Sequence, residues 1–358
     1  MSSHAGSEEA VELGVSVKLA PGVRVRATRR GMRASLGSSA ERRSTLEPPQ
    51  PAVARLNGQE PAADKTPSIQ DVLEAERLLT TRHLVDFPVS QPALARAPQP
   101  LDVDRVEQQF LPQAMAKVGW LNRARRRAAR EEARLAAIAF ADEQYATARE
   151  EAERLQSEYY SYWNALISHD RDTVVEAVDD AFAEAASEST CVDAGSDPFC
   201  GRYVSCVVTF GQPDVVPDHL VATTPTGRPE LRQRDTLDVN NLYVDAMAST
   251  VLATVREALA VAPATDEVRM VVVRNEPPVA TSPNGGMRVI YAGAFLRRDM
   301  ETVDWQTVDL EAELLRALGA ELVREGDDQT VVPLDEDAHR RMFAVLHAFS
   351  GPEDHGSG

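Results

Sequence analysis

The chain of 358 residues carries 38 basic and 56 acidic side chains, and its net charge of −18 is unevenly distributed. Residues 168–358 hold 15 basic and 34 acidic side chains, a balance that favours solubility and repels nucleic acid, whereas residues 1–167 are nearly neutral and contain clusters of arginine. A chain of this length can bury a sizeable core in two or three domains, and no run of apolar residues reaches the ~20 that a membrane-spanning helix needs.

Composition and cysteine content indicate a bacterial cytoplasmic protein. Only three of the 38 basic residues are lysines, a bias typical of high-GC bacterial genomes. The amino-terminal stretch is acidic and polar, and no basic segment precedes an apolar one as it does in a secretion signal. Three cysteines are too few for a disulfide framework in a chain of this size, so we expect reduced thiols in the cytoplasm.

Residues 12–37 predict a small three-stranded β-meander with one apolar and one basic face. Apolar and polar residues alternate in three short segments separated by Pro21-Gly22 and by Gly31. Such a sheet is marginally stable alone and needs a partner surface. The basic face could bind an anionic ligand, such as the phosphates of nucleic acid or lipid headgroups, although no aromatic residue is present to stack on bases. The alternative is a solvated face, or one that docks on a partner. The candidate anion-binding residues are Lys18, Arg24, Arg26 and Arg33.

Two motifs in this module carry a family resemblance. Residues 18–24 (KLAPGVR) and 30–37 (RGMRASLG) resemble the amino-terminal module of the bacterial domain-of-unknown-function family 4236. Residues 82–88 (RHLVDFP) and 118–120 (VGW), which precede an arginine- and alanine-rich helix, are similar to longer actinobacterial members, and so, more loosely, is the carboxyl-terminal domain. The resemblance implies a modular architecture and brings no known reaction with it.

A disordered linker and a short helical segment follow the meander. Residues 38–67 are rich in Pro, Ser, Glu and Ala and predict a flexible linker. Residues 68–84 have helical periodicity, with Ser68 as a helix cap and Asp71 three residues later. A proline-rich spacer completes the segment 68–100.

Residues 101–190 predict a long helix followed by a second one that begins at Asp170. The long helix runs from about residue 104 to 168, with a break or kink at Pro112. It is too long to be buried in a small domain, so we expect it to pack on a second helix, of its own chain or of another. Positions spaced alternately three and four apart form a coiled-coil-like seam in which ten of fourteen residues are apolar. The seam comprises Leu121, Ala124, Ala128, Glu131, Leu135, Ile138, Asp142, Tyr145, Arg149, Ala152, Gln156, Tyr159, Trp163 and Leu166.

A basic cluster opens the long helix. A tryptophan beside a basic helical face can indicate binding to a membrane surface. Acidic residues follow immediately and the apolar face is mostly alanine, which favours a solvated flank of the helix instead. The cluster comprises Lys117, Trp120, Arg123, Arg125, Arg126, Arg127 and Arg130.

Residues 200–350 predict an acidic α+β domain whose sheet is mixed or mainly antiparallel, followed by a disordered tail at 351–358. An almost purely apolar segment should form a central strand. A polar break is expected before the domain, from residue 187 to 201. The predicted strands are 203–210, 219–223, 268–273, 287–296, 321–324 and 330–333, and the predicted helices are 238–261, 308–318 with a stop at Gly319, and 335–349.

The sequence contains none of the common local motifs for phosphate binding, zinc proteases or serine hydrolases. Cys191, Cys200 and Cys206, with His169 or His219, lack the close cysteine spacing of structural zinc, so we expect two loop cysteines and one strand cysteine and no metal or cofactor. Asp193 and Asp197 could bind a cation but lack the dense ligand spacing of a calcium loop, so we expect a solvated loop. Glu325, Asp327 and Asp328 could be paired carboxylates for metal-dependent hydrolysis, but a turn is the stronger interpretation. Asp335 and Asp337 would lie at a helix start.

The fold class expected is therefore α+β and multidomain: a small amino-terminal β-meander, a long central coiled-coil-like helix and a carboxyl-terminal domain with a mixed or antiparallel sheet. The function expected is a non-enzymatic binding or scaffold protein with an unknown protein partner or with self-association through the long helix. Two alternatives stay open, a hydrolase-like enzyme with its site in the carboxyl-terminal domain and a binder of anionic surfaces. The basic module could also dock on the acidic domain.

Overall fold

The computed structural model describes the strand backbones 15–20, 23–28 and 31–36, and then residues 67–116, 118, 122–185, 187–199, 201–277 and 286–335. The chain divides into two compact units. The first, which contains residues 1–90 and 166–358, is called the α+β domain here. The second, residues 91–165, is called the helical arm.

Three short antiparallel strands confirm the predicted amino-terminal meander. They are β1 (Val15–Ala20), β2 (Val23–Thr28) and β3 (Gly31–Leu36), in the order β1-β2-β3. The register sets Lys18 opposite Arg24 and Arg26 opposite Arg33. The predicted linker at 38–66 lies outside the described residues.

A mixed five-stranded sheet forms the centre of the α+β domain, as the sequence predicts. Its order is β10-β9-β8-β5-β4, in which β5 and β8 are parallel and all other neighbours are antiparallel. The strands are β4 (Ser189–Asp197), β5 (Gly201–Phe210), β8 (Glu267–Glu276), β9 (Gly286–Leu296) and β10 (Leu318–Glu321). Two hairpins accompany the sheet, β6 (His219–Thr223) with β7 (Pro229–Gln233) and β11 (Val323–Glu325) with β12 (Thr330–Val332).

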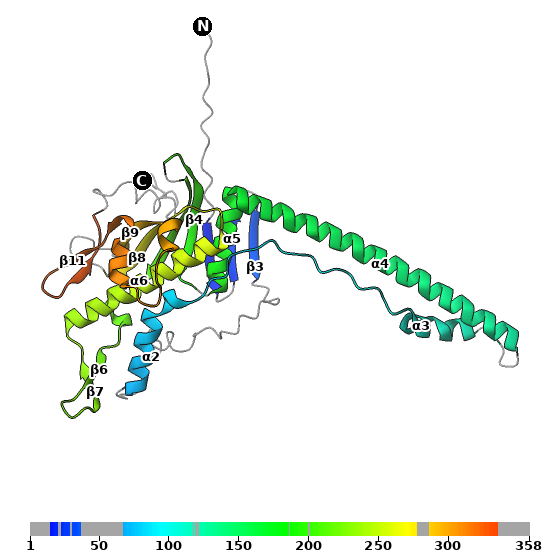
Figure 1. Ribbon diagram of the computed structural model, residues 1–358, viewed down its shortest axis with the longest axis horizontal. Helices are drawn as coiled ribbons and strands as arrows, with labels where there is room; N and C mark the ends of the chain where they lie inside the picture. Colours follow the sequence, from blue (N-terminus) through cyan, green and yellow to red (C-terminus); the bar gives the residue numbers. More distant parts are fainter. Residues whose placement is uncertain are drawn as a thin grey trace, which may run out of the picture. The chain divides into compact units, whose positions relative to one another are not determined.

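The helix α6 (Thr236–Val261) connects the two parallel strands and lies along the sheet (Figure 1). It begins where the Asp235 side chain accepts a hydrogen bond from the Asp238 N–H, 2.8 Å away, and it ends two residues before Pro263. Three helices pack against α6: α2 (Ile69–Thr80), α5 (Arg171–Glu184) and α8 (Leu310–Leu315). The predicted cap at Ser68 is present at the start of α2, where Ser68 and Asp71 form a capping box. Short helical turns occur at η1 (Arg82–Leu84), η2 (Pro213–Val215) and α7 (Arg297–Met300).

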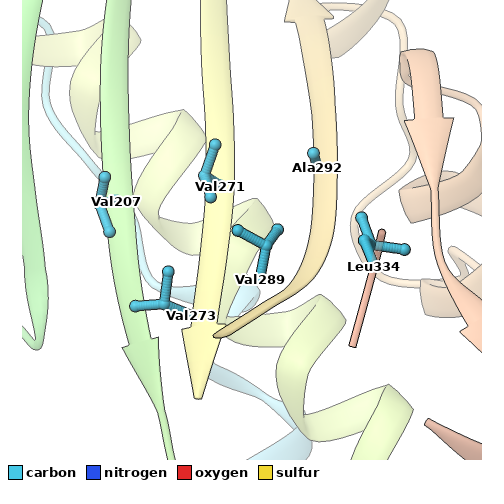
Figure 2. Close-up of a cluster of buried hydrophobic side chains, with 6 residues drawn as sticks. All are labelled: Val207, Val271, Val273, Val289, Ala292 and Leu334. Atoms are coloured by element: carbon cyan, nitrogen blue, oxygen red, sulfur yellow. The ribbon is translucent and has the colours of Figure 1, made fainter. Parts of the chain in front are cut away.

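The central position of β8 confirms the prediction from its apolar sequence. Val271 and Val273 of β8 lie in a buried cluster on one face of the sheet (Figure 2). The intervening residue Val272 faces the other way, because side chains alternate along a strand, and it is buried too. A strand covered on both faces needs apolar residues at every position, which is the pattern of this segment. The other members of the cluster are Val207, Val289, Ala292 and Leu334.

Two predictions for the α+β domain are wrong in detail. The expected polar break before the domain is in fact the edge strand β4, which pairs with β5 despite its small polar residues. The helix predicted at 308–318 ends at Leu315, because Leu318 and the residues after it pair with β9, where Gly319 adopts a φ of +60°. In both cases pairing with a neighbouring strand decides the conformation, and local periodicity does not report it.

The helical arm contains two helices where the sequence predicts one. They are α3 (Val103–Ala116) and α4 (Arg123–Ser168), and Pro112 lies inside α3 instead of ending it. The side chain of Asn122 accepts a hydrogen bond from the Arg125 N–H at 3.1 Å and so caps the start of α4. The chain therefore restarts its helix at Asn122, ten residues after the proline.

None of the helices in the described residues combines the length and the apolar character needed to cross a bilayer. The helix predicted at 335–349 and the tail at 351–358 lie almost entirely outside the described residues.

Candidate self-association surface

The arm helices α3 and α4 lie alongside each other (Figure 1). The rings of Phe110 and Phe140 are 5.7 Å apart between centroids, and Val106 of α3 is buried. On α4, four alanines spaced four residues apart share one face and are at most 5% exposed. These alanines leave room for the larger side chains of α3. They are Ala129, Ala133, Ala137 and Ala141.

The predicted seam of α4 lies on the side away from these alanines. At about 100° per residue, Leu135 and Ile138 are on the opposite half of the helix from Ala133. Leu135, Ile138 and Tyr145 are 64%, 37% and 39% exposed. The long helix thus packs on a second helix, as predicted, but it does so through its alanine face. The seam, which carries larger apolar side chains, is exposed to solvent.

The open part of the seam is bounded at its carboxyl-terminal side. Gln156, itself a seam position, accepts a hydrogen bond from the Ala95 N–H at 2.8 Å and donates one to the Ala93 carbonyl at 3.3 Å. The segment before α3 therefore covers the helix near Gln156. From Ala124 to Arg149 every seam position is exposed, and this stretch is called the open seam below.

Charge is distributed along α4 in the direction opposite to the one a helix favours. Residues 123–134 contain six arginines and two glutamates, whereas residues 135–168 contain six acids and two arginines. The first turn has no acid and the last turn has no base. A helix macrodipole favours acids at the amino-terminal end and bases at the carboxyl-terminal end, so this arrangement does not serve the isolated helix.

Some of the acids in residues 135–168 form ion pairs with arginines of the same helix. Arg149 contacts Glu153 at 2.8 Å, and Arg154 contacts Glu151 and Glu158 at 2.5 Å each. The hydrogen bond from Arg154 lowers the pKa of Glu151. All of these side chains are more than half exposed, and such pairs contribute little to stability and exchange partners readily.

The basic residues singled out by the sequence lie in two separate places. The backbone register of the meander sets Lys18 opposite Arg24 and Arg26 opposite Arg33, and binding of an anion by these residues stays a prediction. Lys117 and Trp120 of the second cluster lie outside the described residues, and its arginines occupy the first turns of α4.

Cys191 and Cys206 do not gather with His169 or His219, and Cys200 lies outside the described residues. Cys191 lies in β4, directly opposite Cys206 of β5, so the prediction of a loop position for Cys191 is wrong. Both thiols are buried, and the contact with Cys191 together with burial raises the pKa of Cys206. His169 bonds the Tyr203 carbonyl at 3.0 Å, and His219 contacts Asp218. Within the described part of the chain, no group of three or more potential metal-binding side chains is close enough to hold an ion.

The acids predicted to lie in a loop are also in β4. Asp193 accepts hydrogen bonds from Arg171 at 2.8 Å and from the Tyr203 hydroxyl at 3.1 Å. Asp197 lies 3.5 Å from Arg269, whose guanidinium stacks on the Tyr203 ring at 3.8 Å. Both carboxylates are paired with arginines of the same domain, so their role is to stabilise the fold. The acidic turn predicted at residues 325–328 does connect β11 and β12.

The carboxyl ends of parallel strands are a common place for ligands, and here side chains of the protein occupy that end of β5 and β8. Arg274 is 4% exposed and donates hydrogen bonds to Glu276 at 2.6 Å, to the Val331 carbonyl at 3.1 Å and to the Tyr243 hydroxyl at 3.3 Å. The Tyr243 hydroxyl donates to the Gly211 carbonyl at 2.8 Å, and burial raises its pKa to about 12. Sequence reasoning missed this network, for which an arginine at the end of an apolar strand is the only signal.

The motif at residues 82–88 attaches η1 to α6. His83 Nδ1 lies 3.1 Å from the Ser249 hydroxyl, and burial lowers the pKa of His83. Arg256 of α6 donates a hydrogen bond to the His83 carbonyl, and its guanidinium lies over the rings of Trp305 at 4.6 Å and Phe87 at 5.6 Å. These contacts give the motif a packing role.

Comparisons with protein-family models, curated proteins and solved structures test whether the chain has recognisable relatives. The resemblance of the meander motifs to family 4236 stays a prediction. No family model, no curated protein and no solved structure matches this chain.

Proposed function

We propose that this protein is a non-enzymatic scaffold that self-associates through the open seam of α4 and so joins two α+β domains in one assembly. The observation that carries the proposal is the position of the seam. Its large apolar side chains Leu135, Ile138 and Tyr145 lie on the exposed side of α4, while alanines face α3. Exposed apolar residues in a periodic row are the pattern of a helix that packs on a partner.

The α+β domain supports a binding role more than a catalytic one. The buried arginine Arg274 fills the edge of the sheet where a ligand would enter an α/β fold, and its partners are Glu276 and Tyr243 of the same domain. The free thiols of Cys191 and Cys206 support a reducing compartment, and we therefore propose a cytoplasmic location.

The test is the mass of the full chain in solution. We expect light scattering after size exclusion to give about twice the monomer mass of 39.1 kDa at micromolar concentration. Replacing two seam residues together, Leu135→Glu and Ile138→Glu, should yield monomers because charges would then line the interface. Ala136→Glu, exposed but off the seam, is the matched control and should leave the dimer intact. A wild-type chain that stays monomeric up to about 100 µM would falsify the proposal.

A second candidate function is the binding of a phosphate-bearing ligand by the meander. The register observation favours it: Lys18 lies opposite Arg24, and Arg26 lies opposite Arg33. Like charges directly opposite each other destabilise a sheet, and a polyanion would relieve that repulsion. Reversing Arg24→Glu and Arg26→Glu should abolish salt-sensitive binding to duplex DNA or to anionic vesicles. An intact protein that binds neither at low salt would remove this candidate.

A further inference from the structure

We infer that the partner of the open seam is a second copy of α4 in antiparallel orientation, with the twofold centre between Ile138 and Asp142. This inference rests on the proposed self-association and specifies its geometry. It is carried by the order of residues along the open seam, by the side of α4 on which α3 packs, and by the charge distribution of α4.

The seam matches itself when one copy is turned end to end. In an antiparallel coiled coil, each core position packs between the positions of the other heptad class on its partner. With the centre between Ile138 and Asp142, Leu135 packs against Tyr145 of the second copy. The same operation brings Ile138 to Asp142, and Glu131 to Arg149. Because the pairing is symmetric, each of these contacts occurs twice.

The polar members of the seam decide between the two orientations. In a parallel pair in register, Glu131 would meet its own copy, and so would Asp142 and Arg149. Three layers of like charge would then lie in one interface, and like-charge contacts are strongly unfavourable there. The antiparallel pair replaces two of those layers with a Glu131–Arg149 contact at each end.

The flanks of the seam favour the same orientation. Turning one copy places its arginine-rich residues 123–134 beside residues 146–157 of the second copy, which carry three glutamates and two arginines. Arg125 then lies close to Glu153 of the second copy. The charge separation that opposes the helix macrodipole in one copy becomes complementary between two.

The existing contact of Arg149 with Glu153 is compatible with this arrangement. Both side chains are about two-thirds exposed. An exposed ion pair of this kind holds its geometry weakly, so Arg149 can bind Glu131 of the second copy while Glu153 binds Arg125. The result is a chain of alternating charges across the interface.

A charge-reversal cycle in the full-length protein tests the register. Glu131→Arg and Arg149→Glu should each weaken the dimer by at least about tenfold in Kd, because each places like charges opposite one another at both ends. The double variant Glu131→Arg with Arg149→Glu should return the Kd to within about threefold of wild type. Glu143→Arg, on α4 but off the seam, is the control and should leave the Kd unchanged. All four should keep the wild-type helical content by circular dichroism.

Cysteine cross-linking tests the orientation independently. Under a mild oxidant, the double variant Leu135→Cys with Tyr145→Cys should form covalent dimers, whereas Leu135→Cys alone should not. In the antiparallel pair, the two copies of position 135 are about 15 Å apart along the axis, beyond the reach of a disulfide. The wild-type chain, whose Cys191 and Cys206 are buried, is the control.

The possible failures are separable. A monomeric wild-type protein overturns the proposed function and this inference together. A dimer in which the double charge reversal does not restore binding, in which the single reversals have no effect, or in which Leu135→Cys alone cross-links efficiently overturns the antiparallel register and leaves self-association standing.

Discussion

The 26-residue helix α6 of the α+β domain is buried along most of its length, whereas the 46-residue α4 of the arm is exposed on every side from residue 142 to 151. Tertiary packing stabilises α6, and its sequence is apolar on nearly every face. In contrast, α4 relies on alanine, on packing with α3 over part of its length and on local ion pairs. A long helix that the described part of the chain leaves uncovered has surface to offer a partner.

The largest expected difference between the two regions comes from the same substitution made in both. Leu252→Ala on α6, at a fully buried position, should lower the free energy of unfolding of the α+β domain by about 2–5 kcal/mol. Leu135→Ala on α4 should leave the free energy of unfolding of this domain unchanged within about 0.5 kcal/mol. Urea unfolding, followed by hydrogen exchange of peptides from β5 and β8, measures both. Equal losses would mean that the arm and the domain unfold as one unit.

A buried carboxyl of α6 should make the stability of the domain depend on pH. Burial, and then the nearby Glu184, raise the pKa of Glu257 from 4.5 to about 7. Because the folded state holds this proton more tightly than the unfolded state does, stability is highest below pH ~4.5 and falls as the pH rises toward ~7. Glu257→Gln should therefore stabilise the domain by about 1–3 kcal/mol above pH 7 and flatten this dependence. Unfolding free energies of the wild type and the variant, measured from pH 4.5 to 8, test this prediction. A variant with the pH profile of the wild type would show that Glu257 does not cause the pH dependence.

The contact between α3 and α4 should be weakened by a larger side chain at one alanine of α4 but not by the same side chain at the neighbouring alanine. Ala137→Leu inserts a large side chain at a fully buried position facing α3 and should cost about 1–3 kcal/mol. Ala136→Leu adds the same atoms at an exposed position and should have little effect. Faster hydrogen exchange in α3 of the first variant alone is the expected result. Similar exchange in both would show that the alanines do not carry the α3 contact.

The smallest effect is expected for the surface ion pairs of α4. Arg154→Gln removes contacts with Glu151 and Glu158, but all three side chains are more than half exposed. The helical content should change only slightly at low salt, and the difference should disappear in about 1 M salt, where exposed charges are screened. A large loss of helix measured by circular dichroism would mean that these pairs, and not packing with α3, hold the arm together.

Part of the candidate surface was predictable from spacing alone. The seam through Leu135, Ile138 and Tyr145 follows from the alternation of three- and four-residue steps. The sequence does not say which face α3 covers, because Ala129, Ala133 and the alanines after them form a second row at helical spacing. The structure places α3 on the alanine row and leaves the seam open.

What the sequence by itself determined is the local structure with strong signals: the central strand β8 from its apolar run, and the start of α2 at Ser68 with Asp71. Such features depend on residues close together in the chain. Tertiary structure alone decided the rest. The strand β4 exists because β5 offers it a ladder of hydrogen bonds, and Arg274 is buried because Tyr243 and the Val331 carbonyl, distant in sequence, receive its donors. Contacts between distant segments leave no periodic trace, so they appear only once the chain has folded.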